Sequence, residues 1–335
     1  MEPPLVSVVL AARDAEATID ESVQSVLGQT LGDLELVVVD DGSHDGTPAR
    51  LAAIDDGRLR VVRNPEALGL AGALNVGLDA AHGTYVARMD ADDVALPHWL
   101  ERLVARIGQA PGVAVVGTGM IDLHDDGRLG TVHRLPTGAR AVRWAALFSS
   151  PFFHSTVLVD RAVLERHGLR YDTSFGESED FDLWARLLEH ADGANLPEAL
   201  VLYRKHPAQA STRRAELQRD CQRRVALRQI AALAPELDVA AAELAWRAGA
   251  GRPVGDDEAD GAAEALGKLV AAFERRHGGR EARRAAAWSL AGPGAAPPPC
   301  GSTRRFRSRP SAGSAGDVRR APSARRRPAG SPARA

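Results

Sequence analysis

The chain has 335 residues, of which 44% are hydrophobic and 26% are charged, so it can form one large domain or two ordinary domains around a sizeable core. Its formal net charge of −2 hides an asymmetry, because residues 296–335 carry ten Arg and one Asp, a net +9 that leaves −11 on the preceding 295 residues. Its two cysteines, Cys221 and Cys300, exclude a disulfide framework and a cysteine-based metal centre, and they fit a reducing compartment.

Short apolar runs alternate with amphipathic segments over the first 110 residues. The apolar runs are rich in β-branched residues, which predicts strands over residues 6–10, 34–39, 59–62 and 85–89. In the segments between them apolar side chains recur on one helical face, which predicts helices over residues 16–27, from 47 onward, over 69–81 and over 97–107. This alternation favours an α/β fold with a mostly parallel sheet that is covered by helices on both faces.

The pattern changes after residue 110. Residues 113–116 are predicted to form another strand, and Asp125-Asp126-Gly127 is typical of a hairpin turn, so the sheet is expected to gain antiparallel members here. An amphipathic segment follows over residues 139–148, and a further helix is expected to open after Gly176. The last strand is expected over residues 200–203.

Composition divides the chain into three parts. Residues 1–211 make up the predicted α/β domain. Residues 212–290 are rich in Ala, Glu, Arg and Leu with helical periodicity, interrupted near 249–257, which predicts a helical appendage. Residues 291–335 are rich in Arg, Pro and Ser without apolar periodicity, which predicts a disordered tail.

Acidic residues follow the carboxyl ends of several predicted strands, namely Asp14, Asp40, Asp41, Asp90, Asp92 and Asp93. Ligands of open α/β sheets bind at this edge, so the coincidence indicates a site. Asp90 and Asp92 have the D-x-D spacing that lets two carboxylates converge on a hard divalent cation. The alternative is that Asp92 or Asp93 only caps the helix that follows.

Several short motifs occur in order along residues 6–211. They are Ser7-Val-Val-Leu, Ser25-Val-Leu-Gly-Gln-Thr, Val37-Val-Val-Asp-Asp-Gly-Ser, Ala73-Leu-Asn, Ala87-Arg-Met-Asp-Ala-Asp-Asp, His154-Ser-Thr, Glu179-Asp-Phe-Asp-Leu-Trp and Tyr203-Arg-Lys-His. In this order they resemble the inverting nucleotide-sugar glycosyltransferases of glycosyltransferase family 2. The resemblance implies the GT-A fold, with a Rossmann-like sheet. One departure is Ala11-Ala-Arg-Asp14, where family members more often have Pro-Thr-Tyr-Asn, and it concerns how the base or ribose is gripped.

The resemblance assigns roles on the donor side. It implies Asp92 as a metal ligand, Asp90 as a ligand of the metal or ribose, and Arg88 as a charge that offsets the diphosphate or the aspartates. The residues implied to line the nucleotide pocket are Ala11, Ala12, Asp14, Asp40 and Asp41. His206 is implied to bind metal or diphosphate, and His154 to lie near the donor and the acceptor. The alternatives are that Asp40 only shapes its turn and that both histidines are hydrogen-bonded structural residues.

Inversion requires one displacement at the anomeric carbon, with a base that takes the proton from the acceptor hydroxyl. The resemblance assigns the Glu179-Asp180 pair to catalysis, with Asp180 as the base and Glu179 as a supporting residue. We expect the start of a helix to keep Asp180 ionised at neutral pH. The alternative reading of Asp180 is an ordinary acid at a helix N-terminus.

The function implied is that of a metal-dependent inverting hexosyltransferase that uses Mn²⁺ or Mg²⁺. It would move a sugar from a nucleoside diphosphate sugar, with UDP as the expected nucleotide, to a hydroxyl of a glycan or lipid-linked acceptor in cell-surface polysaccharide synthesis. A sugar nucleotidyltransferase is one alternative, although its Gly-rich basic loop is missing and only Arg13 stands there. A catalytically silent nucleotide-sugar-binding protein is another, and intact Asp92 and Asp180 argue against it.

The sequence also bears on location. Residues 1–5 carry no basic, apolar leader, and no uncharged apolar run approaches ~20 residues, so we expect neither a secretory signal nor a membrane span. We therefore expect a cytoplasmic protein without a nucleic-acid partner, and peripheral contact with the inner face of the plasma membrane stays open. The Arg-rich tail is expected to be a solvated end rather than a segment that binds lipid or nucleic acid.

Overall fold

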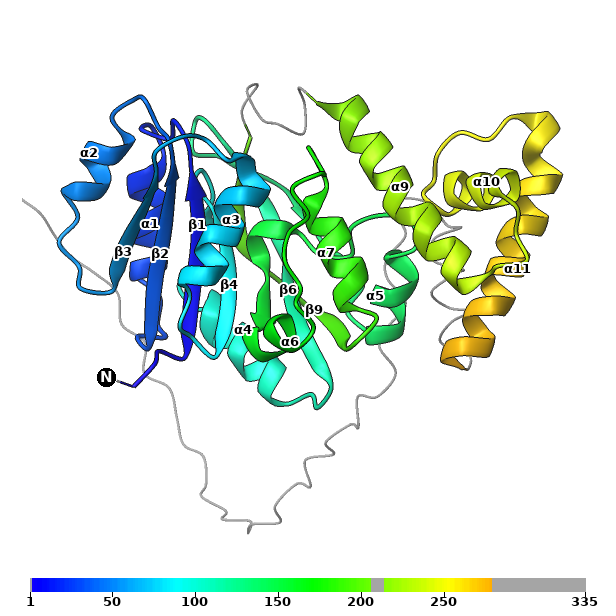
Figure 1. Cartoon of the computed structure of the whole chain (residues 1–335), viewed down its shortest axis with the longest axis horizontal. Helices are drawn as coiled ribbons and strands as arrows, with labels where there is room; N and C mark the ends of the chain where they lie inside the picture. Colours follow the sequence, from blue (N-terminus) through cyan, green and yellow to red (C-terminus); the bar gives the residue numbers. More distant parts are fainter. Residues whose placement is uncertain (1, 206–213, 279–335) are drawn as a thin grey trace, which may run out of the picture. The chain divides into compact units, whose positions relative to one another are not determined.

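The computed structural model describes residues 2–205 and 214–278 (Figure 1). His206, the predicted tail and the end of the predicted appendage lie outside this part. The strands are β1 (Val6–Ala12), β2 (Leu34–Asp41), β3 (Leu59–Asn64), β4 (Tyr85–Asp90), β5 (Val94–Ala95), β6 (Val113–His124), β7 (Leu129–His133), β8 (Leu158–Asp160) and β9 (Asp192–Lys205). They form one sheet in the order β3-β2-β1-β4-β8-β6-β9-β5, and β7 pairs with β6.

The sheet is parallel in its first half and mixed in its second. β3, β2, β1 and β4 pair in parallel, as the alternation of strands and helices predicts. β8 runs antiparallel to both β4 and β6, and β7 forms the predicted hairpin with β6, with Gly127 at a φ of 79° in its turn. β8 was not predicted because it is only three residues long. β9 begins at Asp192, eight residues before the expected strand, because polar residues and Pro197 interrupt its apolar pattern.

The helices are α1 (Ile19–Leu27), α2 (Thr47–Ala52), α3 (Gly69–Ala80), α4 (Trp99–Gly108), α5 (Ala139–Ala145), α6 (Arg161–Arg166), α7 (Glu179–Leu187), α9 (Ala215–Leu233), α10 (Val239–Gly249) and α11 (Ala259–His277). Short 3₁₀ turns are η1 (His154–Thr156) and η2 (Asp256–Glu258). None of the described helices combines the length and apolar character that a membrane-spanning segment needs.

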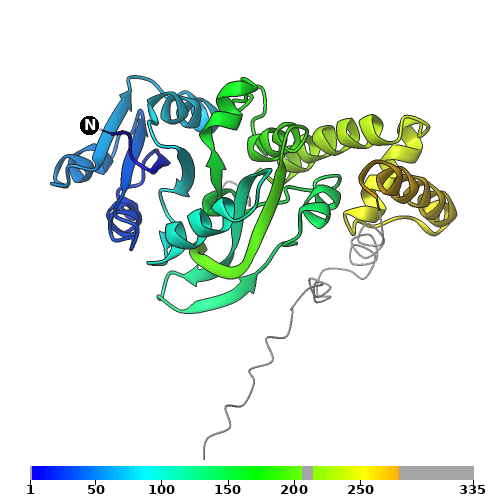
Figure 2. The same ribbon diagram turned by 90° about the horizontal axis from the view of Figure 1, so that it is seen from below.

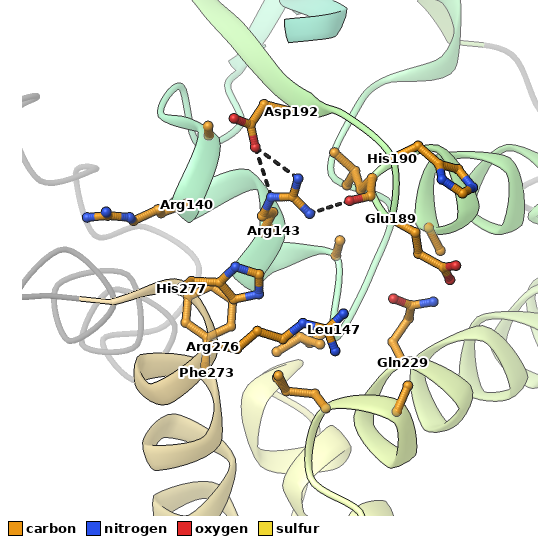
Figure 3. Close-up of a pocket in the computed structure, with 16 residues that line it drawn as sticks. Arg140, Arg143, Leu147, Glu189, His190, Asp192, Gln229, Phe273, Arg276 and His277 are labelled. Carbon is orange, nitrogen blue, oxygen red and sulfur yellow. Dashed lines mark hydrogen bonds and ion pairs between the residues drawn. The ribbon is translucent and has the colours of Figure 1, made fainter. Parts of the chain in front are cut away.

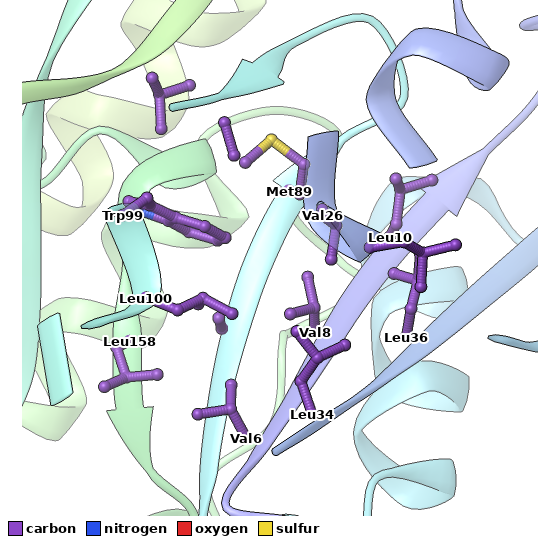
Figure 4. Packing of buried hydrophobic residues seen from close by; sticks show 14 of the residues in the cluster. Val6, Val8, Leu10, Val26, Leu34, Leu36, Met89, Trp99, Leu100 and Leu158 are labelled. Carbon is purple, nitrogen blue, oxygen red and sulfur yellow. The ribbon is translucent and has the colours of Figure 1, made fainter. Parts of the chain in front are cut away.

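Alternate residues of the central strands face opposite layers of helices, because side chains of a strand alternate between the two faces of a sheet. Val8 and Leu10 of β1 pack with α1 and with the buried Trp99 of α4 (Figure 4). Val9 points to the other face, where it packs in a cluster with Leu74 of α3. The sheet is therefore covered on both faces, as predicted for an α/β fold.

The register of the parallel strands brings the predicted acidic residues to one edge. Ala11 of β1 is paired with Asp90 of β4 on one side, and Ala12 is paired with Asp40 of β2 on the other. Because the three strands run in the same direction, their carboxyl ends open together. The sequence reasoning that placed these aspartates at a common edge agrees with this register.

The C-terminal helices share a hydrophobic core with the α/β domain. Residues of α9, α10 and α11 form one buried cluster with Trp144, Phe148, Phe175 and Phe181. The ring of Phe273 in α11 meets the Trp144 ring edge-on at 5.1 Å. The helical region is interrupted between α9 and α10 at Ala234-Pro235, and this interruption was not predicted. Asp238 caps the start of α10 by accepting the Ala241 N–H. The appendage thus packs tightly onto α5 and α7.

Candidate active site

Three carboxylates gather where β4 ends. Asp90 is the last residue of β4, and Asp92 and Asp93 lie in the short turn before β5. Ligand oxygens of all three lie within 4.8 Å of one another. Asp93 is fully buried whereas Asp90 and Asp92 are partly exposed. Burial and the charges of Asp90 and Asp92 raise the pKa of Asp93 well above its usual range.

Asp93 is held in place by contacts from distant parts of the chain. One of its carboxylate oxygens accepts the backbone N–H of Arg204 in β9 at 3.0 Å, and the Ser155 hydroxyl also bonds to this side chain. The other oxygen, Oδ2, is buried and has no hydrogen-bond partner among residues 2–205 and 214–278. A buried orphan oxygen beside two further carboxylates fits a hard cation, which takes oxygen ligands.

Arg88 is the counter-charge of this cluster. Its side chain is buried, with 4% exposure, and it forms an ion pair with Asp90. Burial disfavours a charged guanidinium, but the Asp90 carboxylate outweighs that cost and the pKa of Arg88 is raised. Arg88 therefore offsets part of the negative charge of this cluster.

The second acidic pair opens α7. Ser178 precedes it in a left-handed conformation with a φ of 59°, and Glu179 and Asp180 occupy the first turn. The Ser150 hydroxyl donates to Asp180 Oδ2 at 3.0 Å. Burial raises the pKa of Asp180, because the loss of hydration outweighs the backbone N–H contacts at the start of the helix.

Glu179 lies deeper than Asp180. Burial, followed by the charge of Asp180, raises its pKa to about 7. Glu179 Oε1 lies 3.8 Å from Nδ1 of His154, whose Nε2 is 2.8 Å from the hydroxyl of Tyr171. Burial and the nearby charge of Arg88 hold the pKa of His154 well below its usual value, so this imidazole is neutral and does not compensate Glu179.

The two acidic groups lie near the same arginine. The charge of Arg88 acts on Glu179, Asp180 and His154 as well as on Asp90. The end of β4 and the start of α7 thus lie within electrostatic reach of the same guanidinium, although about ninety residues separate them in the sequence.

The residues predicted to meet the nucleotide base differ in how fully they are bonded. Asp41 accepts Asn64 Nδ2 at 2.8 Å, the Leu68 N–H at 2.8 Å and the Gly69 N–H at 2.9 Å, so both its oxygens hold the start of α3. Asp40 is 1% exposed and accepts the Ser43 N–H at 3.0 Å through Oδ1. Its Oδ2 lies 3.4 Å from Nε of Arg63 and has no hydrogen-bond partner in the described chain.

The remaining predicted residues of the nucleotide pocket lie beside Asp40. Ala11 and Ala12 end β1, between Asp40 and Asp90. Asp14 has a positive φ of 50° and accepts the His44 N–H at 2.9 Å, while its own N–H donates to the Ser43 hydroxyl at 3.0 Å. These bonds connect the loops after β1 and β2. His206 lies outside the described residues.

Sequence reasoning missed several members of the site. Ser150, Ser155 and Tyr171 bond to Asp180, Asp93 and His154 respectively. Ser155 stands in the His154-Ser-Thr motif but carried no assigned role, and Ser150 and Tyr171 lie outside the quoted motifs. Asp93 belongs to the acidic triplet that indicates a site, but the resemblance gave it no role of its own.

A separate cavity of about 940 Å³ lies at the other end of α7 (Figure 3). Arg143 on its wall bonds to Asp192 at 2.9–3.0 Å, to the Ala191 carbonyl at 2.9 Å and to the Leu188 carbonyl. Its wall also includes Arg276 and His277 of α11. No predicted site residue lines this cavity, so it is distinct from the acidic site.

A family model described as Glycosyl transferase family 2 matches residues 7–168. An uncharacterized glycosyltransferase of Haemophilus influenzae is 34% identical over 221 residues, which cover 62% of this chain and 68% of that protein. The succinoglycan biosynthesis protein ExoO of Rhizobium meliloti is 35% identical over 199 residues, which cover 55% of this chain and 56% of that protein.

Solved structures agree in fold. S. aureus TarS 1–349 in complex with UDP-GlcNAc superimposes with a TM-score of 0.58 at 20% identity, covering 85% of this chain and 89% of that chain. The mannosyltransferase PcManGT of Pyrobaculum calidifontis, in complex with GDP-Man and Mn²⁺, gives 0.54 at 20% identity, covering 87% and 81%. Together with the ordered motifs and the acidic strand ends, these matches show that the chain has a GT-A fold and belongs to glycosyltransferase family 2.

Proposed function

We propose that this family 2 glycosyltransferase is a metal-dependent inverting hexosyltransferase that moves a sugar from a nucleoside diphosphate sugar to an acceptor hydroxyl. The observation that carries the proposal is the placement of two acidic groups, one at the end of β4 and one at the start of α7, around Arg88. Inverting transfer needs two such groups, because the departing diphosphate and the incoming hydroxyl lie on opposite sides of the sugar.

The first group suits the donor. Asp90, Asp92 and Asp93 would hold Mn²⁺ or Mg²⁺, and the buried Oδ2 of Asp93 without a hydrogen-bond donor supports this assignment. A bound cation would neutralise the diphosphate as it leaves. Arg88 adds a positive charge that the chain itself supplies. We keep His206 as a further ligand of the metal or diphosphate.

We assign the uracil contact to Asp40 in preference to Asp41. Asp41 already accepts three donors, whereas Asp40 keeps a buried oxygen without a hydrogen bond. A carboxylate oxygen in that position can accept the imide N–H of a uracil ring. Ala11, Ala12 and Asp14 complete the pocket beside it. UDP is the nucleotide that we propose, and the UDP-GlcNAc held by TarS is in keeping with it.

The second group suits the acceptor. Asp180 is the base that takes the proton from the acceptor hydroxyl, and the Ser150 hydroxyl orients its carboxylate. A raised pKa makes Asp180 a stronger base than an ordinary aspartate while it is ionised. Glu179 supports it from the buried side. His154, kept neutral and hydrogen-bonded to Tyr171, lines the space toward the acceptor.

We place the reaction in the synthesis of a cell-surface polysaccharide, with a glycan or lipid-linked glycan as acceptor. The similarity to a succinoglycan biosynthesis protein supports this class of product. The protein would act in the cytoplasm, at the inner face of the plasma membrane when its acceptor is lipid-linked.

A donor panel tests the proposal. The full chain is incubated with UDP-, GDP- and dTDP-sugars, Mn²⁺ and a set of free and lipid-linked glycans, and free nucleoside diphosphate is measured. Release of UDP that depends on Mn²⁺ and acceptor is the expected result. Release of pyrophosphate from a sugar phosphate and nucleoside triphosphate would indicate a nucleotidyltransferase instead, and binding of UDP-sugars without turnover would indicate a silent binding protein.

A further inference from the structure

Residues 175–182, which include the proposed base Asp180, are in contact with α9 of the appendage. Figure 2 shows α9 beside α7, the helix whose first turn contains Asp180. Arg214, which precedes α9, pairs with Glu177 at 3.3 Å, and the hydroxyl of Ser178 donates to the Gln218 carbonyl at 3.5 Å. Two residues after Asp180, the buried Asp182 forms an ion pair with Arg228 at 2.7 Å.

These contacts come from one face of α9. Positions 214, 218, 221, 225 and 228 are three or four residues apart, which aligns them along a helix. Cys221 and Val225 on the same face are buried in the shared core. The guanidinium of Arg224 also lies 4.4 Å from the ring centre of Phe175, just upstream of Glu177. One face of α9 therefore follows residues 175–182 from end to end.

Residues 175–182 include a backbone conformation that must be stabilised by contacts from other parts of the chain. Ser178 has a φ of 59°, in the left-handed region that a residue with a Cβ rarely adopts. It stands directly before Glu179. Strain of this kind persists only where the surroundings fix it, and it recurs at functional sites. Ser178 itself contacts α9, and so do Glu177 before it and Asp182 after it.

The appendage also reaches the partner of the proposed base. The indole N–H of Trp246 in α10 donates to the Phe148 carbonyl at 3.1 Å, and Trp246 is buried. Two residues further along the chain, Ser150 donates to Asp180. A Cβ added to Gly249 would meet the Phe148 ring at 2.1 Å, so α10 lies as close to this loop as a glycine allows.

We propose that the helical appendage positions the base of the transferase, with Arg228 and Trp246 as its positioning residues. Arg228 fixes α7 through Asp182, and Trp246 fixes the loop of Ser150, so that the Asp180 carboxylate is held from both sides. The inference rests on the proposed function in one respect, since it takes Asp180 to be the base. Neither Arg228 nor Trp246 would touch the donor.

The chain offers a matched pair of variants on α9. Arg228→Ala removes the ion pair that joins α9 to Asp182 and leaves Asp182 paired with Arg186 of its own helix. Arg223→Ala removes an ion pair of the same kind, to Glu243 of α10, inside the appendage. Both arginine side chains are 44% exposed, so the two substitutions remove comparable surface. Arg228→Lys keeps the charge and should restore most of the lost function.

Turnover and UDP affinity are measured on the full chain with the nucleotide sugar that the donor panel selects. Arg228→Ala should lower kcat by about ten- to a hundredfold, because a misplaced catalytic group costs rate, with UDP affinity and donor KM unchanged. Arg223→Ala should keep the wild-type kcat and the wild-type UDP affinity. Equal effects of the two variants, or a parallel loss of kcat and UDP affinity in Arg228→Ala, would show that the appendage only stabilises the fold and would overturn the inference.

Hydrogen exchange gives a readout that needs no substrate. In Arg228→Ala the backbone amides of residues 175–182 should exchange faster, while those of β4 and the Asp90–Asp93 turn keep their wild-type rates. Unchanged exchange at 175–182 would contradict the proposal. If Arg228→Ala fails to fold, Trp246→Phe removes the N–H donor and one ring of the indole while it keeps an aromatic side chain in the core. It should lower kcat alone, and wild-type kcat in that variant would count against the positioning role.

Asp180→Asn separates the two proposals. If it keeps wild-type turnover, the assignment of the base is wrong, whatever Arg228→Ala does. If Asp180→Asn loses turnover while Arg228→Ala and Trp246→Phe keep it, the assignment of the base stands and the positioning role of the appendage is refuted.

Discussion

Glu179→Gln tests the electrostatics of the buried acids through stability alone. Burial and the charge of Asp180 raise the pKa of Glu179 from 4.5 to about 7 in the folded protein. That difference corresponds to roughly 3 kcal/mol of unfolding free energy. Because the folded-state pKa is the higher one, protonated Glu179 favours the fold below about pH 4.5, and this contribution is lost as the pH rises through 7.

Urea unfolding in EDTA at pH 4.5 and pH 8 measures this contribution. Between pH 4.5 and pH 8 the unfolding free energy of wild type should fall by roughly 3 kcal/mol more than that of Glu179→Gln, because glutamine does not ionise. Glu189→Gln is the control: Glu189 is exposed, so its replacement should leave the pH dependence as in wild type. Parallel pH dependence of wild type and Glu179→Gln would refute the reasoning that this carboxyl is desolvated.

Two further predictions concern the assigned roles. Asp180→Asn should lower sugar transfer by about 10²- to 10⁴-fold at unchanged UDP affinity in calorimetry, and near-normal turnover would move the role of base to Glu179 or elsewhere. Asp40→Asn should weaken UDP binding, whereas Asp41→Asn should lower the melting temperature, because Asp41 accepts three donors at the start of α3. If Asp41→Asn impaired UDP binding more than Asp40→Asn, that division would be wrong.

The parallel half of the fold could be predicted from the sequence because its signals are local. β-branched runs alternate with segments that have one apolar helical face, and the aspartates stand directly after those runs. β8 and the first half of β9 were not predicted because they lack such a local signal. β8 has three residues, and β9 begins with polar residues and carries Pro197, so their pairing is decided by neighbouring strands and not by their own pattern.

The site divides in the same way. Asp90, Asp92, Glu179 and Asp180 stand in motifs that can be read along the chain. The groups that hold them come from elsewhere: Ser150 reaches Asp180 across 30 residues, and Arg204 reaches Asp93 across 111. Contacts of such separation leave no spacing in the sequence, and the burial that raises the pKa of Glu179 is equally a property of the packed structure.

The assignment of the base contact shows how structure refines a motif. Asp40 and Asp41 are adjacent, and the sequence favours Asp41 for the base contact, because Asp40 can be interpreted as only shaping its turn. In the structure Asp41 ends β2 with both oxygens bonded to Asn64 and to the start of α3. Asp40 retains a buried oxygen that accepts no hydrogen bond in the described chain and lies 3.4 Å from Nε of Arg63. The hydrogen bonds of the two residues therefore favour Asp40 for the base contact, the reverse of the preference drawn from the sequence.

The central claim is that the three carboxylates at the end of β4 hold the cation that binds the donor's diphosphate. Titration calorimetry of UDP against wild type and Asp92→Asn, each in Mn²⁺ and in EDTA, measures it most directly, with the exposed turn variant Asp126→Asn as control. The account predicts that wild type and Asp126→Asn bind UDP tightly only with Mn²⁺, and that Asp92→Asn binds weakly in both conditions. Tight, Mn²⁺-dependent binding of UDP by Asp92→Asn would contradict it.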